Sequence, residues 1–267
     1  MHLIYKRLSV VLAFAAALAL SVNTQAQDKG YTPSVGQEGK DVIWVPTPES
    51  LVQKMLDMAK LTPTDVHFDL GSGDGRTVIA AAKRGTKAIG IEYNPDMVEL
   101  SKRNAQKEGA TVAARAEFIR GDIFETDFSK ANVLTLYLLP SLNLKLRPTI
   151  LNMKPGTRVV SHAFTMDNWQ ADQTETVEGR TAYLWIVPAK VEGSWRIEGG
   201  GTLALKQLFQ KLEGTVGGRA ITNATLRGDA IAFSVDGRDY SGRVSGDRIE
   251  GSVKGSMSGA WSAMREK

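Results

Sequence analysis

The chain has 267 residues, of which 42% are hydrophobic, and it carries a formal net charge of +4. This length and apolar content suit one full α/β domain with a smaller unit and exclude wholesale disorder. The absence of cysteine excludes disulfides, thiolate metal sites and a cysteine nucleophile, and we expect no metal. Without Lys6 and Arg7, 31 basic residues face 29 acidic ones. That scattered excess of two is too small to predict nucleic-acid binding.

The first 26 residues have the composition of an export signal. Lys6 and Arg7 precede the apolar run Leu8–Val22, and the small residue Ala26 is followed by a polar stretch. This order predicts a secretory signal peptide, a periplasmic or secreted mature protein, and no stable membrane insertion after cleavage. An uncleaved anchor is the alternative, which is disfavoured because the run is shorter than the roughly 20 residues that span a bilayer.

Residues 42–198 alternate between strand and helix signals after a flexible leader at 27–41. Thr47 and Pro48 suit the cap and first turn of a helix, and Pro148 is expected to interrupt a later one. The expected strands are Val66–Leu70, Ala88–Glu92, Glu117–Ile119, Val133–Leu138 and Arg158–Phe164, with two more within Thr174–Val187. The pattern predicts an α/β fold with a doubly wound, Rossmann-like, mostly parallel sheet and late antiparallel strands.

The composition changes in residues 199–267. Half of the 26 glycines lie there, between short apolar runs. The pairs Gly228-Asp229, Asp236-Gly237 and Gly246-Asp247 are typical of hairpin turns. We therefore predict a small antiparallel β-unit, either a half-barrel or a sheet packed on the first domain.

A glycine-rich loop, Asp69–Arg76, follows the first predicted strand at the edge where open α/β sheets bind ligands. It lacks the Lys-Ser/Thr end of a phosphate-binding Walker loop, and Arg76 occupies the sixth position where a dinucleotide fingerprint needs glycine. The leading carboxylate of Asp69 would repel a pyrophosphate but suits the cationic amino-acid end of S-adenosylmethionine. The loop favours this methyl donor over NAD.

Two further carboxylates follow successive strands. Glu92 ends the second strand, where it can accept hydrogen bonds from ribose hydroxyls, and Asp122 follows the third, where it can receive an adenine amino group. Either side chain alone could instead cap a turn or lie on a solvated loop. Three acids at three successive strand ends indicate a binding site.

With these residues, the sequence resembles the seven-strand class of S-adenosylmethionine-dependent methyltransferases. More narrowly, it is similar to the small lysine methyltransferases that act on the ATP synthase c-subunit and the adenine nucleotide translocase. The resemblance covers about 145 residues and is carried by four stretches: Val45–Pro48, Asp69–Arg76, Ala80–Lys83 and Gly90–Pro95. Those relatives are membrane-anchored and intracellular, whereas this chain has an export signal and an added β-unit.

The resemblance implies roles for individual residues. The methyl donor would be bound by Asp69, Gly71, Gly73, Asp74, Glu92, Asp122 and Thr47. Asp74 has an alternative as the cap of the next helix, and His162 is interpreted as a structural residue. Tyr137 and Pro140 would line an apolar catalytic slot that favours the neutral form of an acceptor amine.

The sequence thus predicts an enzyme that N-methylates a protein lysine or another amine, with S-adenosylmethionine as its cofactor. An exported S-adenosylmethionine-binding protein without catalysis and an NAD-dependent oxidoreductase are the alternatives. The partner is expected to be a protein or a small-molecule amine, not a nucleic acid.

Overall fold

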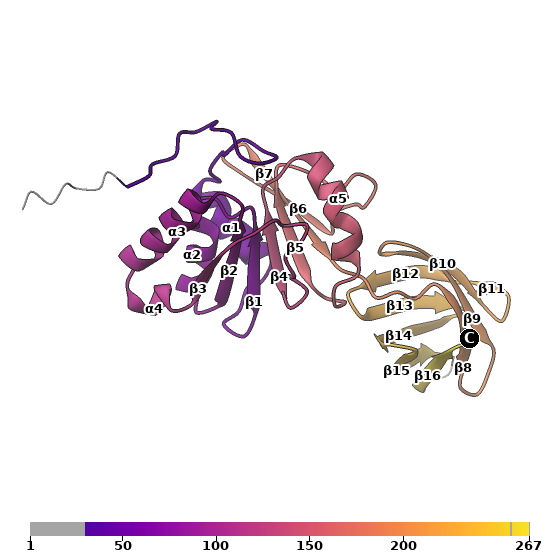
Figure 1. Cartoon of the computed structure of the whole chain (residues 1–267). Helices are drawn as coiled ribbons and strands as arrows, with labels where there is room; N and C mark the ends of the chain where they lie inside the picture. Colours follow the sequence, from indigo (N-terminus) through magenta and orange to yellow (C-terminus); the bar gives the residue numbers. More distant parts are fainter. Residues whose placement is uncertain (1–29, 257, 267) are drawn as a thin grey trace, which may run out of the picture. The chain divides into compact units, whose positions relative to one another are not determined.

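Two β-sheets account for most of the chain, and the computed structural model describes them within residues 30–256 and 258–266 (Figure 1). The expected signal peptide at 1–26 lies outside the described residues. The strands of the first sheet are β1 (Val66–Leu70), β2 (Lys87–Glu92), β3 (Ala116–Arg120), β4 (Val133–Leu136), β5 (Arg158–His162), β6 (Gln173–Val177) and β7 (Arg180–Ile186). In the described part of the chain, no helix is long and apolar enough to cross a bilayer.

The first sheet has the order β3-β2-β1-β4-β5-β7-β6. Strands β1 to β5 run parallel, and β7 pairs antiparallel with both β5 and β6. The parallel strands are almost completely buried because helices cover both faces. This arrangement confirms the predicted doubly wound sheet, and it brings the carboxyl ends of β1, β2 and β3 to one edge.

The helices lie on both faces of this sheet. They are α1 (Glu49–Met58), α2 (Arg76–Lys83), α3 (Pro95–Lys107), α4 (Ala110–Ala113) and α5 (Pro140–Leu151). Apolar residues of α1, α2 and α3 pack together with Ala88 and Phe118 of the sheet. Leu146 and Ile150 of α5 pack against strand residues on the other face, such as Leu134. Because successive strand residues point to opposite faces, one short apolar strand serves both cores.

Two helix details differ from the sequence predictions. Pro48, not Thr47, precedes the first helical residue, and no side chain caps α1. The Thr47 hydroxyl instead lies 3.0 Å from a ring nitrogen of His162. Helix α5 continues through Pro148. The carbonyl opposite that proline belongs to Leu144, whose side chain is 37% exposed, so the helix loses its bond on the solvent side.

The second sheet is an antiparallel meander. Its strands are β8 (Gly193–Ile197), β9 (Thr202–Leu208), β10 (Lys211–Val216), β11 (Arg219–Ala220), β12 (Thr222–Arg227), β13 (Ala230–Val235), β14 (Arg238–Ser245), β15 (Arg248–Gly255) and β16 (Gly259–Arg265). It begins at Gly193, before the expected start at 199, because β8 pairs with both β9 and β16. Strands β11 and β12, at opposite ends of the sheet order, are separated only by Ile221, whose amide donates to Gly214 of β10 (3.0 Å). The sheet therefore curls into a small barrel, more closed than the predicted half-barrel.

Aromatic rings form the core of this barrel. Phe233 stacks on Tyr240 with ring centroids 4.9 Å apart, and Trp261 meets both rings edge-on. The three predicted turns join β12 to β13, β13 to β14 and β14 to β15 as two-residue loops. Each contains a glycine with positive φ, as tight hairpins require.

Candidate functional site

The glycine-rich loop connects β1 to α2 at the carboxyl edge of the first sheet. Gly71, Gly73 and Gly75 have φ angles of 78°, 53° and 82°, a region that favours glycine. The neighbouring helix holds this loop, since Ser101 donates to the Gly73 carbonyl (2.9 Å). A Cβ at Gly73 would lie 2.7 Å from the Trp44 indole nitrogen. The loop therefore presents bare backbone to the pocket and has room for no side chain.

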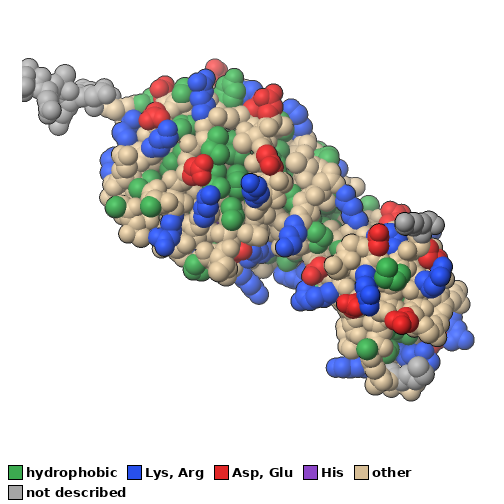
Figure 2. All heavy atoms as spheres, turned by 60° about the horizontal axis from the view of Figure 1, so that its bottom comes forward, with side chains coloured by type: hydrophobic (Ala, Val, Ile, Leu, Met, Phe, Trp, Pro, Cys, Tyr) green, Lys and Arg blue, Asp and Glu red, His purple; other side chains and the backbone are tan. Residues whose placement is uncertain are grey.

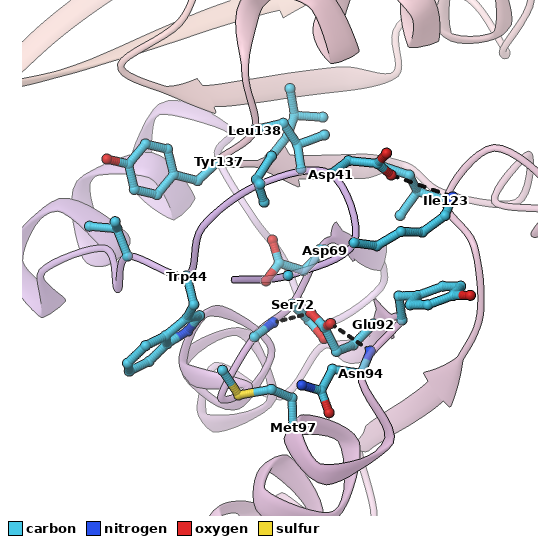
Figure 3. Close-up of a pocket in the computed structure, with 18 of the residues that line it drawn as sticks. Asp41, Trp44, Asp69, Ser72, Glu92, Asn94, Met97, Ile123, Tyr137 and Leu138 are labelled. Atoms are coloured by element: carbon cyan, nitrogen blue, oxygen red, sulfur yellow. Dashed lines mark hydrogen bonds and ion pairs between the residues drawn. The ribbon is translucent and has the colours of Figure 1, made fainter. Parts of the chain in front are cut away.

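The three predicted carboxylates line one pocket at this edge (Figure 3). Glu92 accepts from the Gly73 amide (2.9 Å) and from the Asn94 amide (2.9 Å), which connects the end of β2 to the loop. Asp122 accepts from the Phe124 amide (2.9 Å) and from Lys40 (2.5 Å). These bonds fix both side chains at the pocket while leaving lone pairs for a ligand.

Asp69 lies at the bottom of the pocket, where it is 7% exposed. Burial raises its pKa to about 7 against the effect of the hydrogen bond from Thr135, and the charges of Glu92 and Asp74 raise it further. Thr135 donates to Asp69 (2.6 Å) and also lies 2.8 Å from a ring nitrogen of His67. Desolvation lowers the pKa of that histidine to about 3, so it is neutral at physiological pH. A cation next to Asp69 would restore its charged form.

Asp74 has a structural position in the loop. It forms an ion pair with Arg76 (2.6 Å), whose guanidinium also donates to the Thr47 carbonyl (2.9 Å). Asp74 accepts the Arg76 amide at 3.3 Å, which is the helix-start role weighed in the sequence. Asp74 and Thr47 thus meet through Arg76, and all three line the pocket.

A strap, residues 37–47, forms a wall of the pocket that the sequence did not predict. The expected flexible leader overlaps it, yet the Glu38–Ile43 bridge and the bonds that connect Trp44 with Gly36 and Gln37 (both 2.9 Å) give the strap a regular turn. All eleven of its residues line the pocket. The tryptophan ahead of the Pro-Thr-Pro stretch was the one sequence signal for this wall.

Of the two predicted catalytic residues, the structure brings only Tyr137 to the pocket. Tyr137 lies with Trp44 on the side opposite Ile123 and Glu92 (Figure 3). Pro140 is exposed, begins α5 and is not among the lining residues. Its position is that of a helix-starting proline, since the first helical turn needs no amide donor.

The residues present fit S-adenosylmethionine. Three carboxylates suit a cationic nucleoside with ribose hydroxyls and an adenine amino group, and the open glycine backbone permits close approach. Ser72 adds a buried hydroxyl that has no hydrogen-bond partner among the described residues. The space between the walls, counted out to the open mouth, is about 1040 Å³. Fold and site together define an S-adenosylmethionine-dependent methyltransferase.

Comparison with known proteins identifies the family. Residues 69–173 match the model described as the ANTKMT methyltransferase domain. A protein-lysine N-methyltransferase of Saccharolobus islandicus is 41% identical over 153 residues, which are 55% of this chain and 94% of that protein. The chain belongs to this methyltransferase family, and it is an enzyme. The NAD alternative does not agree with that family.

Two further relatives bear on the acceptor. The Xenopus laevis lysine N-methyltransferase of the ATP synthase c-subunit is 34% identical over 48% of this chain, which spans about half (56%) of that protein. A crystal structure titled RNA methyltransferase from Salinibacter ruber, in complex with S-adenosyl-L-homocysteine, is 50% identical. It covers 55% of this chain and 96% of its own, with a TM-score of 0.53. The relatives' names therefore indicate two different acceptor classes.

Proposed function

We propose that this enzyme transfers a methyl group from S-adenosylmethionine to the amine of a lysine side chain in a protein. The acidic pocket carries the argument. Its lining side chains include six carboxylates, those of Glu38, Asp41, Asp69, Asp74, Glu92 and Asp122. They face two basic side chains, Lys40 and Arg76, so acids exceed bases by four. A cleft of this sign attracts a cationic acceptor and repels a phosphate backbone.

The chain's own residues then have three tasks. The strand-end acids Asp69, Glu92 and Asp122 hold and orient the methyl donor, which supplies a methyl group activated by its sulfonium. Thr47 and Tyr137 form the opposite wall, from which a lysine amine would approach. A free lysine has a pKa of about 10.4, and desolvation in such a slot favours its neutral, nucleophilic form. Orientation of the two reactants alone accounts for several kcal/mol of the barrier.

The name of the Salinibacter ruber structure makes RNA the second candidate acceptor. On the face in Figure 2, lysine and arginine side chains are interspersed with aspartate and glutamate, and no basic stripe runs over it. Proteins that bind RNA through its backbone need such basic surface. The mixed surface and the acidic pocket favour protein lysine.

One labelling experiment separates the two candidates. The full chain is incubated with isotopically methyl-labelled S-adenosylmethionine and an extract, and the products are divided into hydrolysed protein and digested RNA. We expect label in methylated lysine, loss of label with Glu92→Ala, and unchanged label with Glu117→Ala, an exposed acid on β3. Label confined to methylated nucleosides would overturn the lysine assignment, and no label at all would leave a donor-binding protein.

We propose that this reaction takes place outside the cytoplasm. The proposal rests on the sequence of residues 1–26, and cell fractionation with sequencing of the mature N-terminus tests it. We expect a periplasmic or secreted protein beginning at Gln27, and cytoplasmic retention after Leu12→Arg places a charge in the apolar run. A wild-type protein found in the cytoplasm with residues 1–26 intact would overturn the proposal.

A further inference from the structure

A strained turn follows β5 behind the pocket. The Phe164 amide donates to the His162 carbonyl (2.8 Å), which closes a three-residue γ-turn, and the central Ala163 has φ 64°. For a residue with a Cβ this conformation costs about 1–2 kcal/mol, and such turns are rare outside sites that need them. Bonds from the Ala163 amide to the Thr181 carbonyl (2.8 Å) and from Asn143 to the Phe164 carbonyl (3.3 Å) hold the turn in place.

The turn directs two aromatic rings at Tyr137. The ring of His162 lies 3.8 Å from the Tyr137 ring, centroid to centroid, and the ring of Phe164 lies 6.1 Å away with near-parallel planes. Both contacts depend on the reversal of the chain at Ala163, because consecutive residues of an extended strand would point to opposite faces. Tyr137 is therefore held by two rings that one turn positions.

His162 has a second contact, which reaches the strap. Its Nδ1 lies 3.0 Å from the hydroxyl of Thr47, and the side chain is 1% exposed. Desolvation, with a smaller effect from Arg180, lowers the pKa of His162 to about 4. The ring is thus neutral at physiological pH, and one nitrogen can bond to Thr47 while the ring face packs on Tyr137.

We infer that His162 is a positioning residue for the methyl acceptor. It does not line the pocket itself, but it connects Thr47 of the strap to Tyr137 after β4, and these two side chains form the acceptor wall. This inference rests on the proposed function for the place at which the amine enters. A packing role alone would lower stability without affecting catalysis separately from donor binding.

Two substitutions divide the contacts of His162. His162→Phe keeps a ring against Tyr137 and removes the bond to Thr47, whereas His162→Asn keeps a polar group near Thr47 and removes the ring. Val159→Ala is the control, because it removes buried packing from the same strand away from the pocket. Acceptor kinetics are measured with poly-L-lysine, or with total RNA if only RNA is labelled, and donor affinity is measured by calorimetry.

We expect both His162 variants to bind the methyl donor within about twofold of wild type and to lose about tenfold or more in kcat, since small misplacements of a reactant cost that much. Val159→Ala should lose stability and keep both constants. If both His162 variants match the control in kcat and in KM for the acceptor, the inference is overturned.

A spectroscopic readout keeps the test independent of the acceptor. At a ring distance of 3.8 Å, His162 shifts the nuclear magnetic resonance signals of the Tyr137 ring, which Tyr137→Phe identifies in a tyrosine-labelled protein. We expect these signals to move in His162→Asn and to stay in Val159→Ala. Unmoved signals would overturn the inference even if no acceptor were found. Label in RNA would overturn the lysine assignment and leave this result standing.

Discussion

Replacing Asp69 with asparagine should remove a pH dependence of donor binding that the buried carboxyl creates. Burial raises the pKa of Asp69 from 3.8 to about 7, and the methyl donor carries positive charge that favours the carboxylate. The two histidines of the described chain, His67 and His162, have pKa values lowered to about 3 and about 4 by desolvation. They are therefore neutral between pH 6 and pH 8, and Asp69 titrates there without them.

The magnitude follows from the fraction of carboxylate. With a pKa of about 7, Asp69 is about one-tenth ionised at pH 6 and about nine-tenths at pH 8. Donor affinity should thus rise about ninefold over this range in the wild type, which is about 1.3 kcal/mol. Titration of the donor's own amino group affects wild type and Asp69→Asn alike. The difference between the two proteins isolates Asp69.

Isothermal calorimetry in two buffers of different ionisation enthalpy measures both affinity and protons released. We expect release of nearly one proton at pH 6 by the wild type beyond that of Asp69→Asn. Equal pH profiles for the two proteins, with equal proton release, would refute the reasoning. The same group affects folding: because its folded pKa exceeds the unfolded value, the unfolding free energy falls as pH rises from 3.8 to about 7 and then levels.

Three further substitutions test the loop, the strap and the barrel. Gly73→Ala should cost about 1–2 kcal/mol of stability and weaken donor binding, because its Cβ meets Trp44; unchanged affinity by calorimetry would argue against this close contact. Lys40→Gln should tighten donor binding and reduce its salt dependence, since the adenine amino group no longer competes with Lys40 for Asp122. Equal affinity and salt slope would show that the strap does not occupy the adenine site. Gly251→Ala would place a Cβ 1.8 Å from a carbonyl oxygen of β14 and should lower the barrel's stability by about 2 kcal/mol or more, as thermal denaturation would show.

The sequence predicted the elements whose signals are local. Strand β1 and the loop after it stand out because a short apolar run ends in Asp69 and closely spaced glycines. The hairpin turns of the barrel are marked by glycine next to aspartate. Pro140 was wrongly interpreted as a slot residue, because its neighbour Tyr137 lines the pocket whereas the chain has already turned into α5. Apolar character alone does not say which way a loop faces.

By itself, the sequence determined the parallel sheet, the acidic strand ends and the methyl-donor chemistry, because strand period, turn glycines and charge are properties of neighbouring residues. Only the tertiary structure decided which distant side chains meet. Lys40 binds Asp122 across 82 residues, and Thr47 meets His162 across 115. Contacts at such separations depend on how the sheet and the strap pack in three dimensions, and that packing leaves no periodic pattern along the chain.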